Sequence, residues 1–282
     1  MIRHHLGMDL RGANVLLTGA TGGIGQALAR ALAGRGARLV LTGRRADVLE
    51  PLAERLGGRA IAADLADRAT AESLLDEAGR VDVLVANAAL PASGLLSEYS
   101  IGEIDRALDV NLRAPIVMAK LAAAQMADRG RGHLVFVSSL SGKTASGHAS
   151  LYNATKFGMR GFALALREDL RPHGVGVSTV FPGFIRDAGM FAEAGVTLPR
   201  GVGTRSPRDV ARATVRAVAY KAFTAVCTHQ GCTVGGVANG LIKCHCHGSE
   251  FKITDGSVQH GPAKAPLKEY PVRVEGGGIV VT

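Results

Sequence analysis

The feature that most constrains this chain is a glycine-rich turn between its first strand pattern and its first helix pattern. Asn14–Thr18 is a short apolar run typical of a buried strand, and apolar residues at helical spacing begin at Ile24. Glycine lets the backbone between them turn tightly and approach a pyrophosphate, which the free N–H groups of the helix N-terminus can bind. We therefore predict a phosphate-binding turn that includes Gly19, Thr21, Gly23, Ile24 and Gly25.

Strand and helix patterns then alternate along the chain. Further strands are expected at 38–42, 60–63, 81–85, 134–137 and 175–181, and helices at 23–33, 46–56, 68–78, 101–129, 150–172 and 207–219. This alternation requires a parallel sheet with right-handed crossovers and helices on both faces. The expected fold is α/β, a doubly wound parallel Rossmann sheet.

The pattern changes near residue 220. Short β-type runs follow between glycines and prolines, at 223–226, 241–243, 251–253, 272–274 and 279–281. They predict a small all-β module, so we expect two domains, 1–219 and 220–282. The run at 223–226 is expected to be either the last strand of the first domain or the first strand of the second.

The positive charge of the chain is dispersed. The chain has 33 basic and 24 acidic residues, for a net charge of +9, and they are scattered without a long run of like charges. We expect a basic surface and no nucleic-acid partner. No apolar run approaches the roughly 18 residues of a membrane span, and the first residues lack a signal-peptide core, so a cytoplasmic protein is expected.

The end of the second strand pattern indicates which dinucleotide the first domain binds. An acid there would bind a ribose 2′-OH, whereas arginine accommodates a 2′-phosphate. The chain has Arg44 and Arg45 and no acid, which favours NADP over NAD. Asp64, after the third strand, is placed to meet the adenine edge or to cap a helix.

A tyrosine and a lysine four residues apart predict the chemical centre. Tyr152 and Lys156 share one helix face, where the ammonium would lower the pKa of the phenol. Ser139 follows the fifth strand pattern, at the sheet edge where ligands bind, and its hydroxyl can hold a substrate oxygen. Asn111 can fix a water in the proton path or act as a polar helix breaker.

Residues 8–219 resemble the short-chain dehydrogenase/reductase family. The motifs are TGATGGIG at 18–25, NAA at 87–89, Asn111, SSLSG at 138–142, YNATK at 152–156 and PG at 182–183. The resemblance implies that Tyr152 is the general acid/base and that Lys156 lowers its pKa and binds the ribose. It also implies that Ser139 orients the carbonyl and that Asn111 supports a proton relay.

The same resemblance implies further cofactor contacts, from Asn87, Pro182, Gly183 and Ile185. Asp187 stands where the family usually has a hydroxyl residue, which puts one contact to the nicotinamide carboxamide in question. Homo-oligomers through the long helices are typical of the family and are expected here.

All four cysteines of the chain lie between 227 and 246, with histidines beside them. Thiolates and imidazoles suit iron and zinc, so this cluster predicts a metal site. The pattern CTHQGC…CHCHGS resembles the Rieske iron–sulfur signature, and the resemblance covers about 220–282 with Gly261 and Pro262 as the covering loop.

The Rieske resemblance implies a [2Fe–2S] cluster and a ligand set. Cys227 and Cys244 would hold one iron, and His229 and His247 the other, which raises the reduction potential. Cys232 and Cys246 would form a disulfide between the two loops, and Ser249 would hydrogen-bond a bridging sulfide. A zinc knuckle and a metal-free disulfide scaffold are the alternatives.

The sequence thus predicts an NADP-dependent oxidoreductase of a small carbonyl or alcohol, with an appended and apparently shortened Rieske segment. A nicotinamide passes two electrons and the cluster takes one, and there is no flavin signature, so we expect the two modules to act independently. The cluster would then have its own redox partner. The alternative is a Rieske electron-transfer protein with a non-catalytic Rossmann domain.

Overall fold

The computed structural model describes residues 8–188, 203–218, 222–238, 240–253, 256–270, 272–275 and 278–281. It divides into two compact units. The first unit is Leu10–Val218, and the second contains all the strands that follow it. No helix in the described residues is long and apolar enough to cross a membrane.

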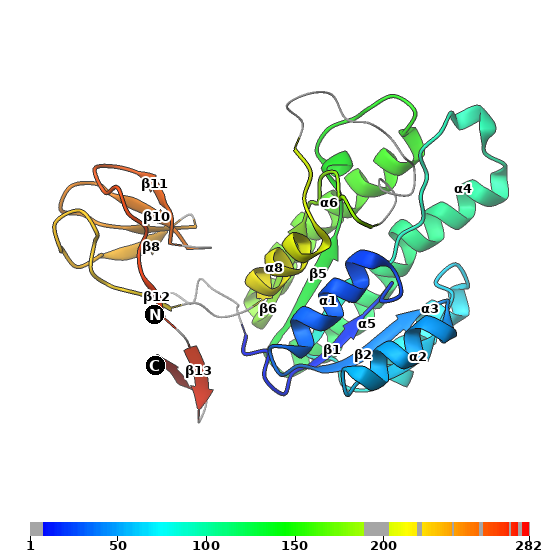
Figure 1. Cartoon of the computed structure of the whole chain (residues 1–282), viewed down its shortest axis with the longest axis horizontal. Coiled ribbons are helices and arrows are strands. Elements are labelled where there is room, and N and C mark those ends of the chain that lie inside the picture. Colours follow the sequence, from blue (N-terminus) through cyan, green and yellow to red (C-terminus); the bar gives the residue numbers. More distant parts are fainter. Residues whose placement is uncertain are drawn as a thin grey trace. The chain divides into compact units, whose positions relative to one another are not determined.

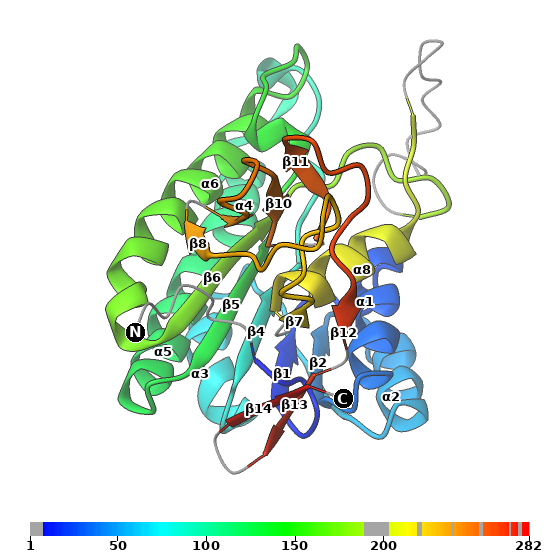
Figure 2. The ribbon, with the colours of Figure 1, turned by 90° about the vertical axis from the view of Figure 1, so that its left-hand side faces the viewer.

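The first unit is built on one parallel six-stranded sheet of order β3-β2-β1-β4-β5-β6 (Figure 2). Its strands are β1 (Asn14–Leu17), β2 (Arg38–Gly43), β3 (Arg59–Ala62), β4 (Val83–Ala86), β5 (Gly132–Val137) and β6 (Val175–Val180). Strands β4 and β5 are buried at every position, as expected for a sheet covered on both faces. The strand order reverses between β1 and β4, and such a switch point is where α/β sheets bind ligands.

Helices cover both faces of this sheet (Figure 1). They are α1 (Gly23–Ala33), α2 (Ala46–Arg55), α3 (Arg68–Ala78), α4 (Ile101–Leu108), α5 (Ala114–Asp128), α6 (Ser150–Leu170) and α8 (Pro207–Val218). Helix α8 packs on α1, and α3 packs on α5. The predicted doubly wound parallel sheet is confirmed.

One predicted helix, 101–129, is interrupted in the structure. Helix α4 ends at Leu108, a π-helical turn covers Asp109–Arg113, and α5 then begins at Ala114. Pro115 lies in the first turn of α5, where its missing N–H is not needed. Pro115 in the sequence indicates a boundary or kink in this helix, and the structure has the break just before it, although the π-turn itself contains no glycine or proline.

The second unit consists of short antiparallel strands. They are β7 (Ala222–Phe223), β8 (Gly236–Ala238), β9 (Leu241–Lys243), β10 (Glu250–Lys252), β11 (Val258–His260), β12 (Glu269–Tyr270), β13 (Val272–Glu275) and β14 (Gly278–Val281). Strands β8 to β11 form one sheet of order β11-β10-β9-β8, and β13 pairs with β14. The predicted all-β module is confirmed.

The run expected as one strand at 223–226 is shorter than predicted. Only its first residue belongs to β7, and Val226 forms an isolated bridge with Thr233. Strand β7 pairs with β12 in antiparallel fashion, which decides between the two alternatives in favour of the second unit. The partner strand lies more than 40 residues away, which is why local sequence pattern left the choice open.

Candidate functional site

The glycine turn has no room for side chains. Gly19 has φ of +66°, and a Cβ there would lie 2.7 Å from the Cα of Ala88. A Cβ on Gly25 would collide with the carbonyl oxygen of Gly19, and one on Gly23 with the side chain of Ala188. The turn therefore presents bare backbone at the start of α1, so it fits a dinucleotide phosphate.

Thr18 fixes this turn against the end of β4. Its buried hydroxyl accepts hydrogen bonds from the backbone N–H groups of Asn87 and Ala88, both at 3.0 Å. The Asn87 amide donates in return to the carbonyls of Thr18 and Gly19. Asn87 thus holds the turn in place. Thr18 was not predicted as a site residue, although its position before the first glycine was a usable signal.

The two arginines after β2 have different surroundings. Arg45 Nη2 donates to the carbonyl oxygen of Thr21 at 2.7 Å, so its guanidinium supports the glycine turn. Arg44 is exposed beside Asp64. Asp64 accepts from Arg106 at 2.7 Å and from the backbone N–H of Ala66, and α3 is capped by Asp67 instead. The alternative role of Asp64 as a helix cap is therefore wrong.

Three predicted catalytic side chains converge beyond the ends of β4 and β5. Ser139 follows β5, and its hydroxyl hydrogen-bonds Tyr152 of α6. Lys156 lies one turn further along α6, with its Nζ 5.5 Å from the centre of the Tyr152 ring. The Lys156 ammonium donates to the carbonyl oxygen of Val137 at 3.3 Å, so it is held between the tyrosine and the end of β5.

Burial governs the ionisation of this group. It raises the pKa of Tyr152 above its usual value, and the hydrogen bond from Ser139 only partly opposes it. Burial also lowers the pKa of Lys156 to about 8. The expected lowering of the tyrosine pKa by the lysine is therefore wrong for the protein without cofactor, because the ammonium faces a backbone carbonyl and not the phenol oxygen.

Asn111 lies in the π-helical turn, with its side chain buried. Its Oδ1 accepts from the backbone N–H of Leu90 at 2.7 Å, and its Nδ2 donates to the Leu90 carbonyl at 2.9 Å. The side chain thus ties the turn to the loop after β4. This bridge is neither of the two predicted roles, and a water in the proton path stays a prediction.

The loop after β6 brings the remaining predicted contacts to the same edge of the sheet. The Pro182 carbonyl accepts from Leu140 N, one residue after Ser139. Gly183 packs against the Leu140 side chain, and Ile185 is buried in a bridge with Arg205. Asp187 has φ of +71° and pairs with Arg186, and the next residue reaches Gly23. The loop therefore spans from the serine to the glycine turn.

Asn153 is a second residue that the sequence reasoning missed. Its buried amide donates to the carbonyls of Ser141 and Thr144, and its Oδ1 accepts from Ser146 N. These contacts shape the loop between Ser139 and α6. Its place inside YNATK, next to the tyrosine, was the available signal.

The four predicted cluster ligands form two pairs in the second unit, one of cysteines and one of histidines. The side chains of Cys227 and Cys244 are buried and hydrogen-bonded to each other. The rings of His229 and His247 lie edge to face, with centroids 4.8 Å apart. The Nδ1 atom of His229 is buried and has no hydrogen-bond partner among the described residues. A buried imidazole nitrogen without a hydrogen-bond partner, on a loop that also carries a buried cysteine, fits a metal ligand.

The surroundings of these ligands favour thiolate sulfur. The Cys227 sulfur accepts hydrogen bonds from the backbone N–H groups of His229 and Gln230 and also bonds Ser249. These donors, with the Cys244 contact, lower the pKa of Cys227 despite its burial. The Ser249 hydroxyl accepts from Ala263 N at 3.2 Å, so the loop after Gly261 closes over it.

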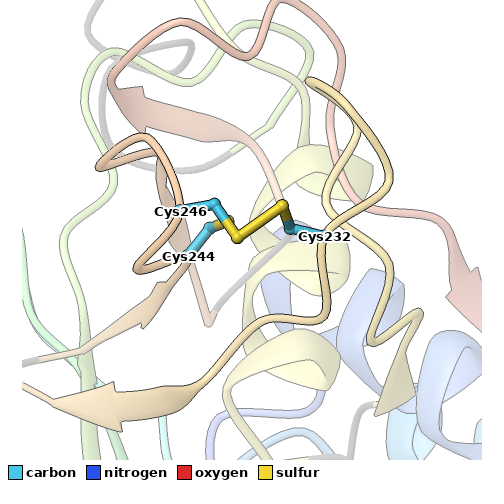
Figure 3. A group of neighbouring side chains, drawn as sticks. All are labelled: Cys232, Cys244 and Cys246. Atoms are coloured by element: carbon cyan, nitrogen blue, oxygen red, sulfur yellow. A yellow bond between two sulfur atoms is a disulfide. The ribbon is translucent and has the colours of Figure 1, made fainter.

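The predicted disulfide is present. Cys232 and Cys246 are joined, with their Cα atoms 6.6 Å apart, and the bond links the two ligand loops. The sulfur of Cys244 lies beside this bond (Figure 3). The disulfide therefore holds both loops around the ligand set.

Comparison with known proteins gives two family matches. The model of short chain dehydrogenases matches residues 13–197, and the model of the Rieske [2Fe-2S] domain matches 204–271. The second match begins before α8, yet α8 packs on α1 within the first unit. The structural boundary is therefore later than the boundary of the family match.

Individual relatives match the first unit. The ketoacyl reductase HetN of Nostoc sp. is 35% identical over 221 residues, which are 75% of this chain and 77% of that protein. The 3-oxoacyl-[acyl-carrier-protein] reductase FabG of Rickettsia conorii is 30% identical over 181 residues, which are 64% of this chain and 75% of that protein. A solved short-chain dehydrogenase from Sphingobium yanoikuyae in complex with NADPH aligns with a TM-score of 0.67 and 30% identity, over 73% of this chain and 86% of that one.

Proposed function

Because the chain belongs to the short-chain dehydrogenase/reductase family and carries a Rieske [2Fe–2S] domain, we propose that Leu10–Val218 interconverts a ketone and an alcohol with NADP. The observation that carries this proposal is the convergence of Ser139, Tyr152 and Lys156 beside the glycine turn. The coarser activity, an NAD(P)-linked oxidoreductase, follows from the family.

In the proposed reaction the bound nicotinamide supplies the hydride, and the protein positions the carbonyl and moves the proton. Ser139 Oγ accepts from Ser141 N at 3.1 Å, and its own hydrogen, which is directed to the Tyr152 oxygen in the protein without substrate, would be donated to the carbonyl oxygen in the complex. The Tyr152 hydroxyl gives that oxygen its proton. Its raised pKa keeps it protonated, as a proton donor must be before the reaction.

Lys156 and Asn111 do not donate the proton themselves but support Tyr152, the proton donor. The ammonium does not lower the pKa of Tyr152 in the protein without cofactor, but it lies near the ring and would favour the phenolate that remains after proton transfer in the cofactor complex. Asn111 holds Leu90, and the nearby carbonyl of Ala92 accepts from Tyr152 N at 3.2 Å, so the loop after β4 is fixed to the start of α6. Both residues thus keep the phenol in place during proton transfer.

The proposed preference for NADP depends on Arg44. Its guanidinium is exposed at the end of β2, whereas Arg45 is already bonded to Thr21. A free guanidinium can bind a 2′-phosphate in a bidentate manner. We therefore assign the phosphate to Arg44 and a supporting role to Arg45.

For the substrate we propose an apolar ketone, with 3-oxoacyl thioesters as the first class to try. Exposed apolar side chains gather on the loops that converge near Tyr152, namely Leu95, Leu96, Leu140 and Phe184. The Gly94 N–H bonds the His148 carbonyl, which draws the first of these loops toward the start of α6. The names of two relatives agree with an acyl substrate.

For the second unit we propose a cluster held by Cys227, His229, Cys244 and His247, exchanging electrons with a separate redox partner. The chain is also proposed to form a homo-oligomer through its long helices. Phe157 and Leu164 support this, since they are 41% and 51% exposed on α6, one above the other at a spacing of two turns.

The substitution Tyr152→Phe tests the proposed activity. It removes only the proton donor, so we expect ketone reduction by NADPH to fall by about 100-fold or more while NADPH binding is retained. Turnover with a panel of 3-oxoacyl thioesters and simple ketones is the measurement, and NADPH fluorescence measures binding. Tyr99→Phe is the matched control, because this tyrosine lies in the loop after β4 and outside the proposed proton path.

Unchanged turnover in Tyr152→Phe would contradict the proposed mechanism. If no ketone is reduced by the parent protein while its electron paramagnetic resonance shows a reducible cluster, the alternative of an electron-transfer protein with a non-catalytic Rossmann domain holds. The same spectra, recorded with NADPH as the only reductant, test whether the two units act independently.

A further inference from the structure

Three sulfur atoms of the second unit form a compact group that the cluster ligand set does not explain. The sulfurs of Cys232, Cys244 and Cys246 all lie within 4.8 Å of one another, although only one of these residues is an expected cluster ligand. Figure 3 shows the Cys244 sulfur beside the Cys232–Cys246 bond. The remaining cysteine, Cys227, is hydrogen-bonded to Cys244. All four cysteines of the chain thus meet in one place.

We propose that this unit has a second metal state, in which the four cysteines bind one Zn²⁺ once the Cys232–Cys246 disulfide is opened. A dithiol reductant opens the bond: two cysteine thiols form, and the reductant is oxidised to its own disulfide. Zinc then binds four thiolates, and the thiol protons go to solvent. This site differs from the iron–sulfur ligand set, because it uses both disulfide cysteines and neither histidine.

The spacing of the sulfurs suits such a site. Zinc binds thiolates at about 2.3 Å in a tetrahedron, which places neighbouring sulfurs about 3.8 Å apart. The three grouped sulfurs are already within 4.8 Å, so small movements of the loops bring them to zinc distance. The sulfur of Cys227 lies outside this group and has to move further. Its hydrogen bond to Cys244, which belongs to the group, gives the direction of that movement.

The backbone around the cysteines is also shaped for thiolate ligands. Cys227 N donates to the Cys232 carbonyl at 2.7 Å and Gly231 N to the Cys227 carbonyl at 3.0 Å, which closes the first loop into a tight turn. Cys244 N and Gly248 N close the second loop in the same way. The N–H groups of His229 and Gln230 point at the Cys227 sulfur and stabilise its negative charge.

The two metal states exclude each other. Cys227 and Cys244 would be ligands in both, so one chain cannot hold the cluster and the zinc ion together. Either metal would tie the two loops and so stabilise the small unit. The state of the disulfide would then decide which metal the unit accepts.

The test uses the full chain after removal of iron and sulfide, with and without a dithiol reductant. Co²⁺ serves as the spectroscopic probe for zinc. In reductant we expect one Co²⁺ per chain, with thiolate-to-metal charge-transfer absorption and tetrahedral d–d bands, and displacement by one Zn²⁺. Without reductant we expect no such spectrum. Failure of either expectation overturns the proposal, and this first measurement needs no variant.

Matched variants separate the two ligand sets. Cys232→Ser and Cys246→Ser should weaken Zn²⁺ binding by about 100-fold or more and reduce the charge-transfer intensity by one thiolate. His229→Ala and His247→Ala should leave Zn²⁺ and Co²⁺ binding unchanged while losing the reconstituted iron–sulfur spectrum. If the histidine variants lose Co²⁺ binding and the serine variants keep it, the four-cysteine site is wrong. Ketone reduction by the first unit plays no part in these readouts.

Discussion

The two units differ in what their cores are made of. The first unit buries many aliphatic side chains on both faces of its sheet, and one continuous cluster of them, with Phe136 among the largest, joins the sheet to α3, α5 and α6. The described core of the second unit has six buried residues, and two of these are Cys227 and Cys244. If these two cysteines are the metal ligands that we propose, a core with a third of its buried residues in that role would depend on the bonds that those ligands form.

Their polar residues differ in the same way. In the first unit the buried Lys156 is destabilising, because burial disfavours its charged form and lowers its pKa to about 8. The aliphatic core around it offsets this cost in stability. In the second unit the buried polar groups surround the ligands, as Ser249 does, and hold the structure together. From this comparison we expect the first fold to be stable without its cofactor, whereas we expect the second fold to depend on its metal.

The largest expected effect is the loss of the second fold when its metal is removed. We expect chelation of iron with the disulfide reduced to unfold residues 220–282 while the first unit stays folded. Amide hydrogen exchange read by mass spectrometry measures both units in one sample. A single cooperative transition of both units in the cluster-free protein would break the comparison.

Replacing the buried lysine should separate function from stability in the first unit. For Lys156→Met we expect a loss of turnover of about 100-fold or more and a first unit that is more stable than the parent at pH 7. The gain is at most about 3 kcal/mol, at about 1.36 kcal/mol per pKa unit.

The pH dependence fixes the sign of this effect. The pKa of Lys156 falls from 10.5 to about 8 on folding, so between these values the unfolded chain binds more protons and the parent gains stability as pH rises. The advantage of Lys156→Met should therefore be constant below pH 8 and shrink above it. Denaturant unfolding between pH 7 and 10 measures this, and a gap independent of pH would show that the ammonium is not the cause.

The two arginines give a smaller effect in the first unit. Arg44→Gln should weaken NADPH binding by about 10-fold and leave NADH binding unchanged, since only the 2′-phosphate contact is lost. Arg45→Gln should weaken both dinucleotides alike, because it releases the carbonyl of Thr21 in the glycine turn. Fluorescence titration with the two cofactors distinguishes these results, and equal losses for Arg44→Gln would refute the assignment.

An effect of similar size is expected at Ser249 in the second unit. Its hydroxyl accepts from Ala263 N and bonds the Cys227 sulfur, so Ser249→Ala should cost the second unit about 1 to 3 kcal/mol and lower the reduction potential of the cluster. Thermal unfolding of the loaded protein and protein-film voltammetry measure the two quantities. An unchanged potential would mean that the hydroxyl serves the loop alone.

Much of the fold and both sets of candidate residues could be predicted from the sequence. The glycine turn, the alternation of strands and helices, and the cysteine–histidine pattern are local features, and local patterns fix local structure. The disulfide between Cys232 and Cys246 was predicted from the family resemblance and is present. Strands of two or three residues, such as β8 and β12, were missed because they are too short for a period to appear.

The sequence by itself determined which residue types stand at the turn, at the helix face and in the two ligand loops. Only the tertiary structure decided what they touch. It tied Arg45 to the turn and turned the Lys156 ammonium toward Val137, and it broke the helix before Ala114. It also gave β7 to the second unit. These outcomes depend on contacts between residues that are far apart along the chain. A local sequence pattern does not show which distant residue will be the partner.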